Sequence, residues 1–391
     1  MKILYHHRIG SKDGQYVHIE EMVAALRAAG HEVRLVGPDG FDDQEFGGES
    51  GLVSRLKARI PASVYELLEF GYNVVDYARL ARAIHEFQPD VIYERYNLYL
   101  LSGAVARRRF RVPLLVEVNA PLYAERSAYS GLKLAGLARW AERCAWRSAD
   151  HVFSVTQVLA DQIASAGVAD RALTITPNGI NHQRFSADAD TAGAKTALGI
   201  DPRATVLGFV GFAREWHGLD AVVELLTEYR DSRTLHFLLV GDGPVTEELK
   251  AQAERAGVAD RVTITGVVGR DEVQRYVNAF DVAMLPNVVA YASPLKLFEY
   301  MACAKAIVAP RQPNLEEILT DTRDALLFEP GSRASFQQAV RALIDDGDHR
   351  ARLGSAARET LTTRDLSWAA NASHVVSVAE EVCASPELTS R

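Results

Sequence analysis

The most constraining stretch of this sequence is residues 281–309, where the pattern changes from strand to helix and back to strand. Residues 281–286 and 305–309 are short apolar runs, and apolar side chains recur at helical spacing from Leu295 to Met301. A strand, a helix and a second strand in this order pack as parallel neighbours in one sheet. The stretch therefore predicts an α/β fold with a parallel sheet.

The helix of this stretch is expected to begin with Ser293 as the N-cap and Pro294 as the first helical residue. The free backbone N–H groups around Leu295 and the positive end of the helix dipole would suit a phosphate. Lys296 adds a cation in the first turn, and Glu299 shares its face of the helix. An ordinary surface pair of lysine and glutamate is the alternative interpretation.

The same alternation of apolar strands and helices runs through the whole chain. Further strands are predicted at residues 2–5, 31–36, 90–93, 113–116, 151–155, 174–180, 205–211, 235–240, 262–266 and 326–331. Many of them are followed by polar or glycine residues, among them His6, Glu94, Glu117 with Asn119, Arg214 with His217, and Gly241. Ligands of parallel sheets bind outside the carboxyl ends of the strands, so these residues are candidates for a site.

The length of 391 residues indicates two domains. We expect an N-terminal domain at 1–185, a C-terminal domain at 186–365 and a last helix within 366–391. The small, polar segment 186–196 is interpreted as the linker, and Asp188-Ala-Asp190 within it as a solvated loop rather than a metal site. Residues 39–48 are expected to form a loop, and residues 52–86 a helix broken at Pro61.

Composition excludes several classes of protein. Hydrophobic residues make up 48% of the chain and charged residues 24%, as in ordinary globular proteins. The net charge of −8 and the lack of a base-stacking module argue against nucleic acid as a partner. The three cysteines show no metal spacing, and neither a membrane-length apolar run nor a signal peptide is evident. We therefore expect a cytoplasmic protein with reduced thiols.

The stretch 291–303 resembles the C-terminal signature of the retaining glycosyltransferases of family 4, also called group 1. That family has the GT-B fold, in which two Rossmann-like lobes place parallel sheets on either side of a central cleft. Its usual pattern is a glutamate, seven residues and a second glutamate. Glu299 matches the second, whereas Tyr291 stands at the first. The resemblance extends over nearly the whole chain and includes the turn Pro177-Asn-Gly179 and a last helix at about 366–383, which resembles the helix that crosses back onto the first lobe.

The resemblance implies a nucleotide-diphosphate sugar as donor substrate, with no further cofactor and no metal. Lys296, Arg214 and the backbone at 294–296 would hold the diphosphate. Family members carry a lysine where this chain has His217, so either Arg214 or a protonated His217 would supply that charge.

Further roles follow from the same resemblance. Glu299 would bind the ribose, and the backbone of Val267 and Val268 the base. Gly14 and His18 match a first-lobe loop that lies under the donor and acceptor. Two other first-lobe residues complete the predicted site: Asn119 stands where the family often has a histidine near the reacting carbon, and Glu117 either contacts the acceptor or is a buried, paired carboxylate.

These observations predict a retaining, metal-independent glycosyltransferase acting on a glycan or lipid-linked glycan acceptor. Two alternatives stay open at this point. One is a nucleotide-sugar epimerase of the same fold. The other is a nucleotide-sugar-binding protein without transfer activity, which Tyr291 and Asn119 would suit.

Peripheral contact of the N-terminal domain with the inner face of a membrane is a further hypothesis. Residues 132–147 are amphipathic and basic and include Trp140 and Trp146, and residues 107–111 add positive charge. The alternative is an ordinary domain helix whose tryptophans lie in the core.

Overall fold

The computed structural model describes residues 1–10, 14–38, 60–129, 131–185, 190–232 and 234–385. The chain divides into two compact units, the first formed by Met1–Asn178 with Trp368–Arg391 and the second by Gly179–Ser367. These divisions lie near, but not at, the expected boundaries after residues 185 and 365. The Ile180 N–H donates to the Leu366 carbonyl (3.1 Å), so the chain beyond Asn178 already pairs with a segment of the second unit.

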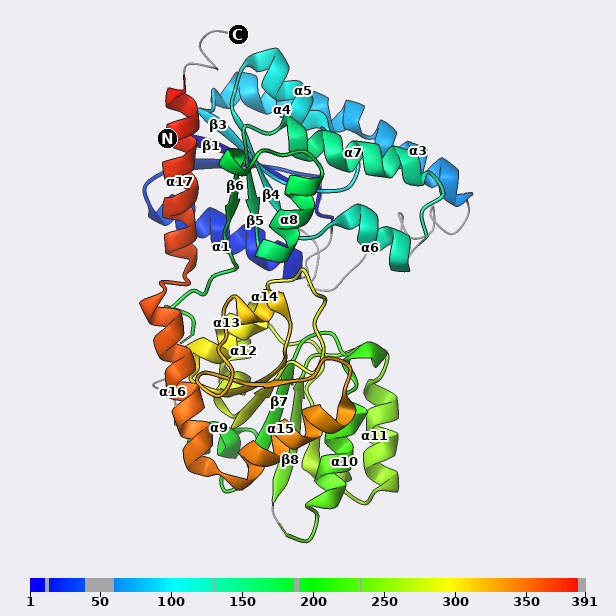
Figure 1. Cartoon of the computed structure of the whole chain (residues 1–391), viewed down its shortest axis with the longest axis vertical. Coiled ribbons are helices and arrows are strands. Elements are labelled where there is room, and N and C mark those ends of the chain that lie inside the picture. Colours follow the sequence, from blue (N-terminus) through cyan, green and yellow to red (C-terminus); the bar gives the residue numbers. More distant parts are fainter. Residues whose placement is uncertain (11–13, 39–59, 130, 186–189, 233, 386–391) are drawn as a thin grey trace. The chain divides into compact units, whose positions relative to one another are not determined.

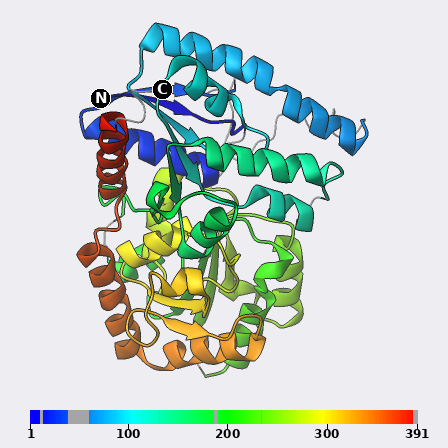
Figure 2. The same ribbon diagram turned by 45° about the horizontal axis from the view of Figure 1, so that its top comes forward.

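The first unit is a parallel sheet in the strand order β2-β1-β3-β4-β5-β6. The helix α17 packs against α1 in this unit, and both views show the two helices side by side (Figures 1 and 2). The Asn371 side chain of α17 also donates to the Pro177 carbonyl (2.8 Å). The elements are β1 (Lys2–His6), α1 (Gly14–Ala28), β2 (Glu32–Val36), α3 (Ala62–Gly71), α4 (Asn73–Phe87), β3 (Val91–Arg95), α5 (Ser102–Phe110), β4 (Leu114–Val118), α6 (Leu122–Tyr129), α7 (Ala135–Ser148), β5 (His151–Ser154), α8 (Gln157–Ser165), η1 (Asp170–Ala172), β6 (Leu173–Ile175) and α17 (Trp368–Ala384).

The second unit is also a parallel sheet, in the order β12-β11-β10-β7-β8-β9. Its elements are α9 (Thr191–Ala197), β7 (Thr205–Val210), η2 (Glu215–His217), α10 (Asp220–Glu228), β8 (Leu235–Val240), α11 (Thr246–Arg255), η3 (Ala259–Arg261), β9 (Val262–Ile264), α12 (Arg270–Asn278), β10 (Val282–Met284), α13 (Leu295–Ala302), β11 (Ala306–Pro310), α14 (Pro313–Glu316), β12 (Leu326–Phe328), α15 (Arg333–Asp345) and α16 (Gly347–Thr363). The α/β fold with parallel sheets in two Rossmann-like units is thus confirmed. None of the described helices is long and apolar enough to span a bilayer.

The second sheet is buried on both faces, as a parallel sheet requires. Alternate residues of β7 enter different cores: Val206 packs in the cluster that includes α13, whereas Leu207 and Phe209 pack in the cluster that includes α10 and α15. Alternate side chains of this apolar strand therefore point into two different cores, one on each face of the sheet, and in the described part of the chain neither face is open to solvent. This burial leaves only the ends of the strands for a site.

The linker prediction for residues 186–196 is wrong where the structure describes it. Residues 186–189, including Asp188, lie outside the described part of the chain, but Thr191–Ala197 is the helix α9. Asp190 is its N-cap and accepts from the Ala192 N–H (3.0 Å). Lys195 is buried and pairs with Asp281 (2.7 Å), which anchors the helix to the second unit.

The helix predicted at 52–86 is confirmed from Ala62 onwards as α3 and α4, which begin after the break at Pro61 and join at Tyr72. The predicted loop at 39–48 and the start of this helix, 52–59, lie outside the described residues.

A cluster of charged side chains is buried in the first unit, where β1 ends. His6, at the end of β1, lies 2.7 Å from Glu94 and 3.1 Å from Asp76, and all three side chains are buried. Burial alone would lower the pKa of His6, but the two carboxylates raise it to about 9. His6 is therefore an imidazolium at neutral pH, and Ser102 donates a further hydrogen bond to Asp76.

This network makes the stability of the first unit depend on pH. The pKa of His6 is raised from 6.5 to about 9 on folding, so its contribution is complete below pH 6.5 and is lost as the pH rises through 9. We expect urea unfolding between pH 6 and pH 9 to show a loss of roughly 2–4 kcal/mol that His6→Gln no longer shows. His85→Gln, at an exposed histidine of α4, is the control. Parallel pH profiles for wild type and His6→Gln would contradict the assignment.

Candidate functional site

The candidate site lies at the carboxyl end of the second sheet, where three strand ends are joined by hydrogen bonds beyond the strands themselves. The Gly211 N–H donates to the Val240 carbonyl (2.9 Å), and the Ala213 N–H to the Asp242 carbonyl (2.8 Å). The Gly241 N–H donates to the Thr265 hydroxyl (3.2 Å). The loops after β7, β8 and β9 therefore form one continuous edge.

Glycine is required at two points of this edge. Gly211 and Gly241 have φ of +127° and +136°, which strain any other residue. A Cβ on Gly241 would lie 2.3 Å from the Gly211 carbonyl oxygen, and one on Gly211 would lie 2.9 Å from Lys296 Nζ. The two glycines let the backbone and the lysine approach each other.

The helix α13 begins one residue later than the sequence predicts. Pro294 has extended backbone angles (φ −75°, ψ 122°) and is the N-cap, so Leu295 is the first helical residue, and the Pro294 side chain makes no capping hydrogen bond. The expected roles of Ser293 as N-cap and Pro294 as first helical residue are corrected accordingly. The first-turn N–H groups at Leu295 and Lys296 still lack intrahelical acceptors, as at every helix start.

Lys296 brings a cation to the end of β7. Its Nζ lies 4.2 Å from the centre of the Phe209 ring, and the side chain is partly buried. Burial lowers the pKa of Lys296 to about 8, although Glu299, one turn along α13, opposes this shift. An incoming anion would restore the full charge, because an opposite charge raises the pKa of an ammonium group.

His217 is a neutral structural residue rather than a second cation. It is buried, and its Nδ1 accepts from the Arg214 N–H (3.0 Å), which ties together the turn η2. Burial and the nearby Lys296 lower the pKa of His217 to about 3. The sequence left either Arg214 or a protonated His217 as the second cation for a diphosphate, and the neutral state of His217 favours Arg214. The exposed guanidinium of Arg214 lies 5.0 Å from the Phe212 ring.

The same edge exposes apolar side chains. Phe212, Trp216 and Val267 are 56%, 47% and 60% exposed, and they are the exposed large apolar residues of the described part of the second unit. All three follow the ends of β7 and β9. Val268 instead packs against the core. An exposed apolar surface beside a cation suits a ligand with a flat base and a charged phosphate.

The loop 285–294 is held by Asn287, a polar residue expected at a strand end, and by Asn314 and Tyr300, which the sequence did not indicate. Asn314 of α14 is buried and donates to the Ala292 carbonyl (2.7 Å), and Asn287 donates to the Trp216 carbonyl (3.0 Å). Tyr300 accepts from the Val210 N–H (3.0 Å) and so fixes α13 against β7. Tyr291 is partly buried in this loop. Asn314 and Tyr300 bond to backbone far away in the chain, so their neighbours in the sequence give no sign of these contacts.

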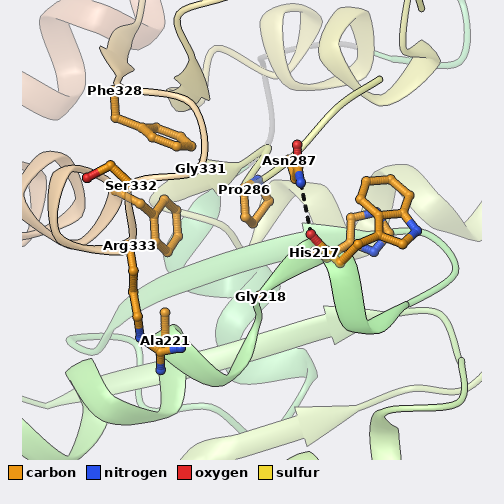
Figure 3. A pocket seen from close by; sticks show the side chains of 11 residues that line it. His217, Gly218, Ala221, Pro286, Asn287, Phe328, Gly331, Ser332 and Arg333 are labelled. Atoms are coloured by element: carbon orange, nitrogen blue, oxygen red, sulfur yellow. Dashed lines mark hydrogen bonds between the residues drawn. The ribbon is translucent and has the colours of Figure 1, made fainter. Parts of the chain in front are cut away.

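A pocket adjoins this edge (Figure 3). His217 is the member of the predicted set that lines it, among the residues the structure describes. Arg333 in its wall is paired with Asp220 and Glu224 (2.6 Å each). The lining residues are Trp216, His217, Gly218, Ala221, Pro286, Asn287, Phe328, Gly331, Ser332, Arg333 and Phe336. Most predicted donor residues therefore lie on the open edge, not in this pocket.

The predicted residues of the first unit form a separate buried network around Glu117 in β4. Arg95 of β3, its register partner, donates to Glu117 (2.7 Å), as does the Tyr93 hydroxyl (2.7 Å). His18 Nε2 lies 3.2 Å from the same carboxylate. Burial opposes ionisation of Glu117, but His18, Arg95 and Tyr93 hold its pKa below the ordinary value of a glutamate. This supports the interpretation of Glu117 as a buried, paired carboxylate.

His18 and Asn119 each keep one buried atom without a hydrogen-bond partner among the described residues, Nδ1 and Oδ1 respectively. A carboxylate only accepts, so His18 Nε2 carries the proton and Nδ1 a lone pair. Burial lowers the pKa of His18 to about 4, and its ring packs edge-on against Trp368 (4.7 Å). Asn119 also hydrogen-bonds to Glu117. Glu117 thus orients two acceptor atoms. Gly14 lies nearby in sequence, at the first residue of α1.

Two Rossmann-like units, the second with a cation at a glycine-lined edge of its sheet, define the chain as a GT-B protein. Two family models match, "Glycosyl transferase 4-like domain" over residues 13–179 and "Glycosyl transferases group 1" over residues 204–346. The chain belongs to the group 1 glycosyltransferases of the GT-B fold.

Individual proteins support the same assignment. The chain is 30% identical over 257 residues to 2-deoxystreptamine glucosyltransferase of Streptomyces kanamyceticus, covering 63% of this chain and 65% of that protein. It is 27% identical over 282 residues to D-inositol 3-phosphate glycosyltransferase of Mycobacterium sp. (strain KMS), covering 68% and 62%. The chain thus spans less than two thirds of either relative. The structure of Anabaena Alr3699/HepE in complex with UDP has a similar fold (TM-score 0.76, 19% identity, 97% of this chain and 100% of that one).

The network around Glu117 predicts a clear difference between two neighbouring substitutions. Glu117→Gln leaves Arg95 buried without its counter-ion and should destabilise the first unit by roughly 3–5 kcal/mol. Asn119→Ala removes one partly satisfied amide and should cost about 1 kcal/mol. Urea unfolding of the two variants beside wild type measures both. Wild-type stability of Glu117→Gln would instead leave this carboxylate available to a substrate.

Proposed function

We propose that this protein is a retaining, metal-independent glycosyltransferase that transfers a sugar from a nucleotide-diphosphate sugar to an acceptor hydroxyl. The observation that carries the proposal is the position of Lys296 Nζ against Gly211, beside the open first turn of α13. The names of both relatives are those of transferases, which favours transfer over an epimerase or a binding protein without activity.

The donor is assigned to the second unit. Lys296, Arg214 and the N–H groups of the first turn of α13 supply positive charge and donors to a diphosphate. Glu299 accepts from the ribose hydroxyls, and the exposed Val267 and the adjoining backbone receive the base. Anabaena HepE, whose structure holds UDP, shares this fold, and UDP-sugars are the first donors to test.

The acceptor is assigned to the first unit. Asn119 Oδ1 and His18 Nδ1, which have no hydrogen-bond partner in the described part of the chain, are acceptors fixed by Glu117, and both can receive hydrogen bonds from sugar hydroxyls. We propose a glycan or lipid-linked glycan. The two relatives are named for 2-deoxystreptamine and D-inositol 3-phosphate, so a small polyhydroxylated ring is the second candidate.

In the proposed reaction the acceptor oxygen attacks the anomeric carbon on the face that the leaving group departs from. The bond from that carbon to the phosphate oxygen breaks, and the nucleoside diphosphate leaves with the electron pair. The acceptor proton passes to the departing phosphate oxygen, so no protein base is required. Lys296 and Arg214 stabilise the charge that develops on the leaving group, and Asn119 positions the sugar.

Two substitutions test the donor site by calorimetry with UDP, GDP and ADP and the matching nucleosides. Lys296→Ala should weaken the bound diphosphate about 10- to 100-fold and leave the nucleoside unchanged, because it removes a charge-assisted contact to phosphate. Glu299→Ala should weaken both, through the ribose. Lys250→Ala and Glu254→Ala, on α11 of the same unit, are matched controls. Unchanged diphosphate affinity in both site variants would refute the assignment.

The reaction itself is tested by the configuration of the product. We expect anomeric coupling constants to show the configuration of the donor, and activity to persist in EDTA because protein cations neutralise the leaving group. Asn119→Ala should lower kcat without adding a new limb to the pH profile, since an amide does not titrate. An inverted product, or activity abolished by EDTA and restored by a divalent cation, would overturn the mechanism.

A further inference from the structure

The helices α3 and α4 have an inverted distribution of polarity. Their outer face carries a stripe of apolar residues at helical spacing, here called the apolar stripe: Val64, Leu67, Leu68, Gly71, Val74, Val75 and Ala78. Its large members are strongly exposed: Val64 43%, Leu67 53%, Leu68 55%, Val74 75% and Val75 53%. A helix of a globular protein normally turns such a stripe toward the core.

The carboxylates of the same helices are turned inward instead. Glu66 is buried and accepts from the backbone N–H groups of Lys133 and Leu134 (2.8 Å each). Asp76 is buried against His6, and Glu69 is paired with Arg126 (2.9 Å). The first exposed carboxylate along α4 is Glu86, near its C-terminal end and paired with Arg34. The stripe therefore presents apolar surface without free negative charge along α3 and most of α4.

A basic face adjoins the stripe. Lys133, Arg139 and Arg143 lie exposed before and along α7, whereas its carboxylate Glu142 is buried against the Tyr96 hydroxyl (2.8 Å). Trp140, between the arginines, is 51% exposed. We name Lys133, Arg139, Trp140 and Arg143 the basic face.

The stripe and the basic face belong to one surface of the first unit. The ring of Phe70 in α3 lies 6.3 Å from that of Trp140 in α7, and Glu66 holds the backbone just before α7. Both views show α3 and α4 along the outside of this unit, with α7 beside them (Figures 1 and 2).

The structure also corrects the sequence hypothesis for this region. Trp146 is buried in the core, and Arg107 is paired with Asp150 through its Nε (2.6 Å), so neither is free to contact a lipid. The exposed groups are those of the basic face, and the apolar part of the surface comes from α3 and α4, which the sequence did not single out.

We propose that the apolar stripe and the basic face together bind the surface of an anionic lipid bilayer. Aliphatic side chains at helical spacing can enter the acyl boundary, while lysine and arginine contact anionic headgroups and a tryptophan lies at the interface. A second copy of this chain fits less well, because a symmetric contact through this surface would bring the two basic faces together. The net charge of −8 also leaves bulk attraction to anionic lipid unfavourable, so binding depends on this local surface.

The test is co-sedimentation of the full chain with vesicles of phosphatidylcholine alone or with phosphatidylglycerol, at low and physiological salt. We expect binding to the anionic vesicles that weakens with salt. The stripe variant Leu67→Ser/Leu68→Ser/Val74→Ser should reduce partitioning at least about tenfold, and Arg139→Glu/Arg143→Glu should do the same. Lys250→Glu/Arg255→Glu makes the same change of charge on α11 and should bind as wild type does.

Two further measurements keep the outcomes distinct. Thermal unfolding should be nearly unchanged in the stripe variant, because the three side chains are exposed. Analytical ultracentrifugation separates lipid binding from self-association: a wild-type dimer that the stripe variant abolishes, without vesicle binding, would overturn the proposal. Equal loss of binding in the α11 control would overturn it too, since bulk charge would then be the cause. None of these measurements requires glycosyl transfer, so they stand apart from the proposed function.

Discussion

The structure depends on one constraint, that a parallel strand must be entered from the same end as its neighbour. Every connection then returns across a face of the sheet, and both faces become buried by helices. In the second unit this leaves the carboxyl ends of the strands as the place where backbone and polar side chains can meet a ligand. Gly211, Gly241 and Lys296 meet there because they follow β7, β8 and β10, which are neighbours in the sheet.

Both units bury charges in pairs: His6 with Asp76 and Glu94 and Glu117 with Arg95 in the first, and Lys195 with Asp281 in the second. Such groups are costly to bury and costly to unpair, and they hold neighbouring side chains in fixed positions. In the second unit the partly buried Lys296 lies against an aromatic ring and a glycine, with its pKa lowered to about 8. An anionic ligand beside Lys296 would stabilise its charged form and offset the cost of burying it.

The outer face of α3 and α4 has the opposite distribution of polarity from an ordinary surface helix. There the acidic side chains Glu66 and Asp76 point inward and accept hydrogen bonds, and the leucines and valines point outward. Burying the carboxylates requires donors from other elements, namely the backbone before α7 and the His6 and Ser102 side chains. The polarity of this helix pair is therefore set by its partners rather than by its own periodicity.

The sequence by itself determined the strands, their parallel arrangement and the family, because apolar runs followed by helices allow few other folds and because residues 291–303 carry a motif. It also placed Lys296 and Glu299 on one face of a helix, since that depends on spacing alone. Only the tertiary structure decided that Pro294 is the N-cap, that residues 191–197 are helical, that His217 is neutral and that Glu117 is fully paired. Each of these depends on burial or on a partner far away in the chain, such as Asn314 for the loop before α13. Burial and long-range partners set pKa values and side-chain orientation, and neither can be read from neighbouring residues.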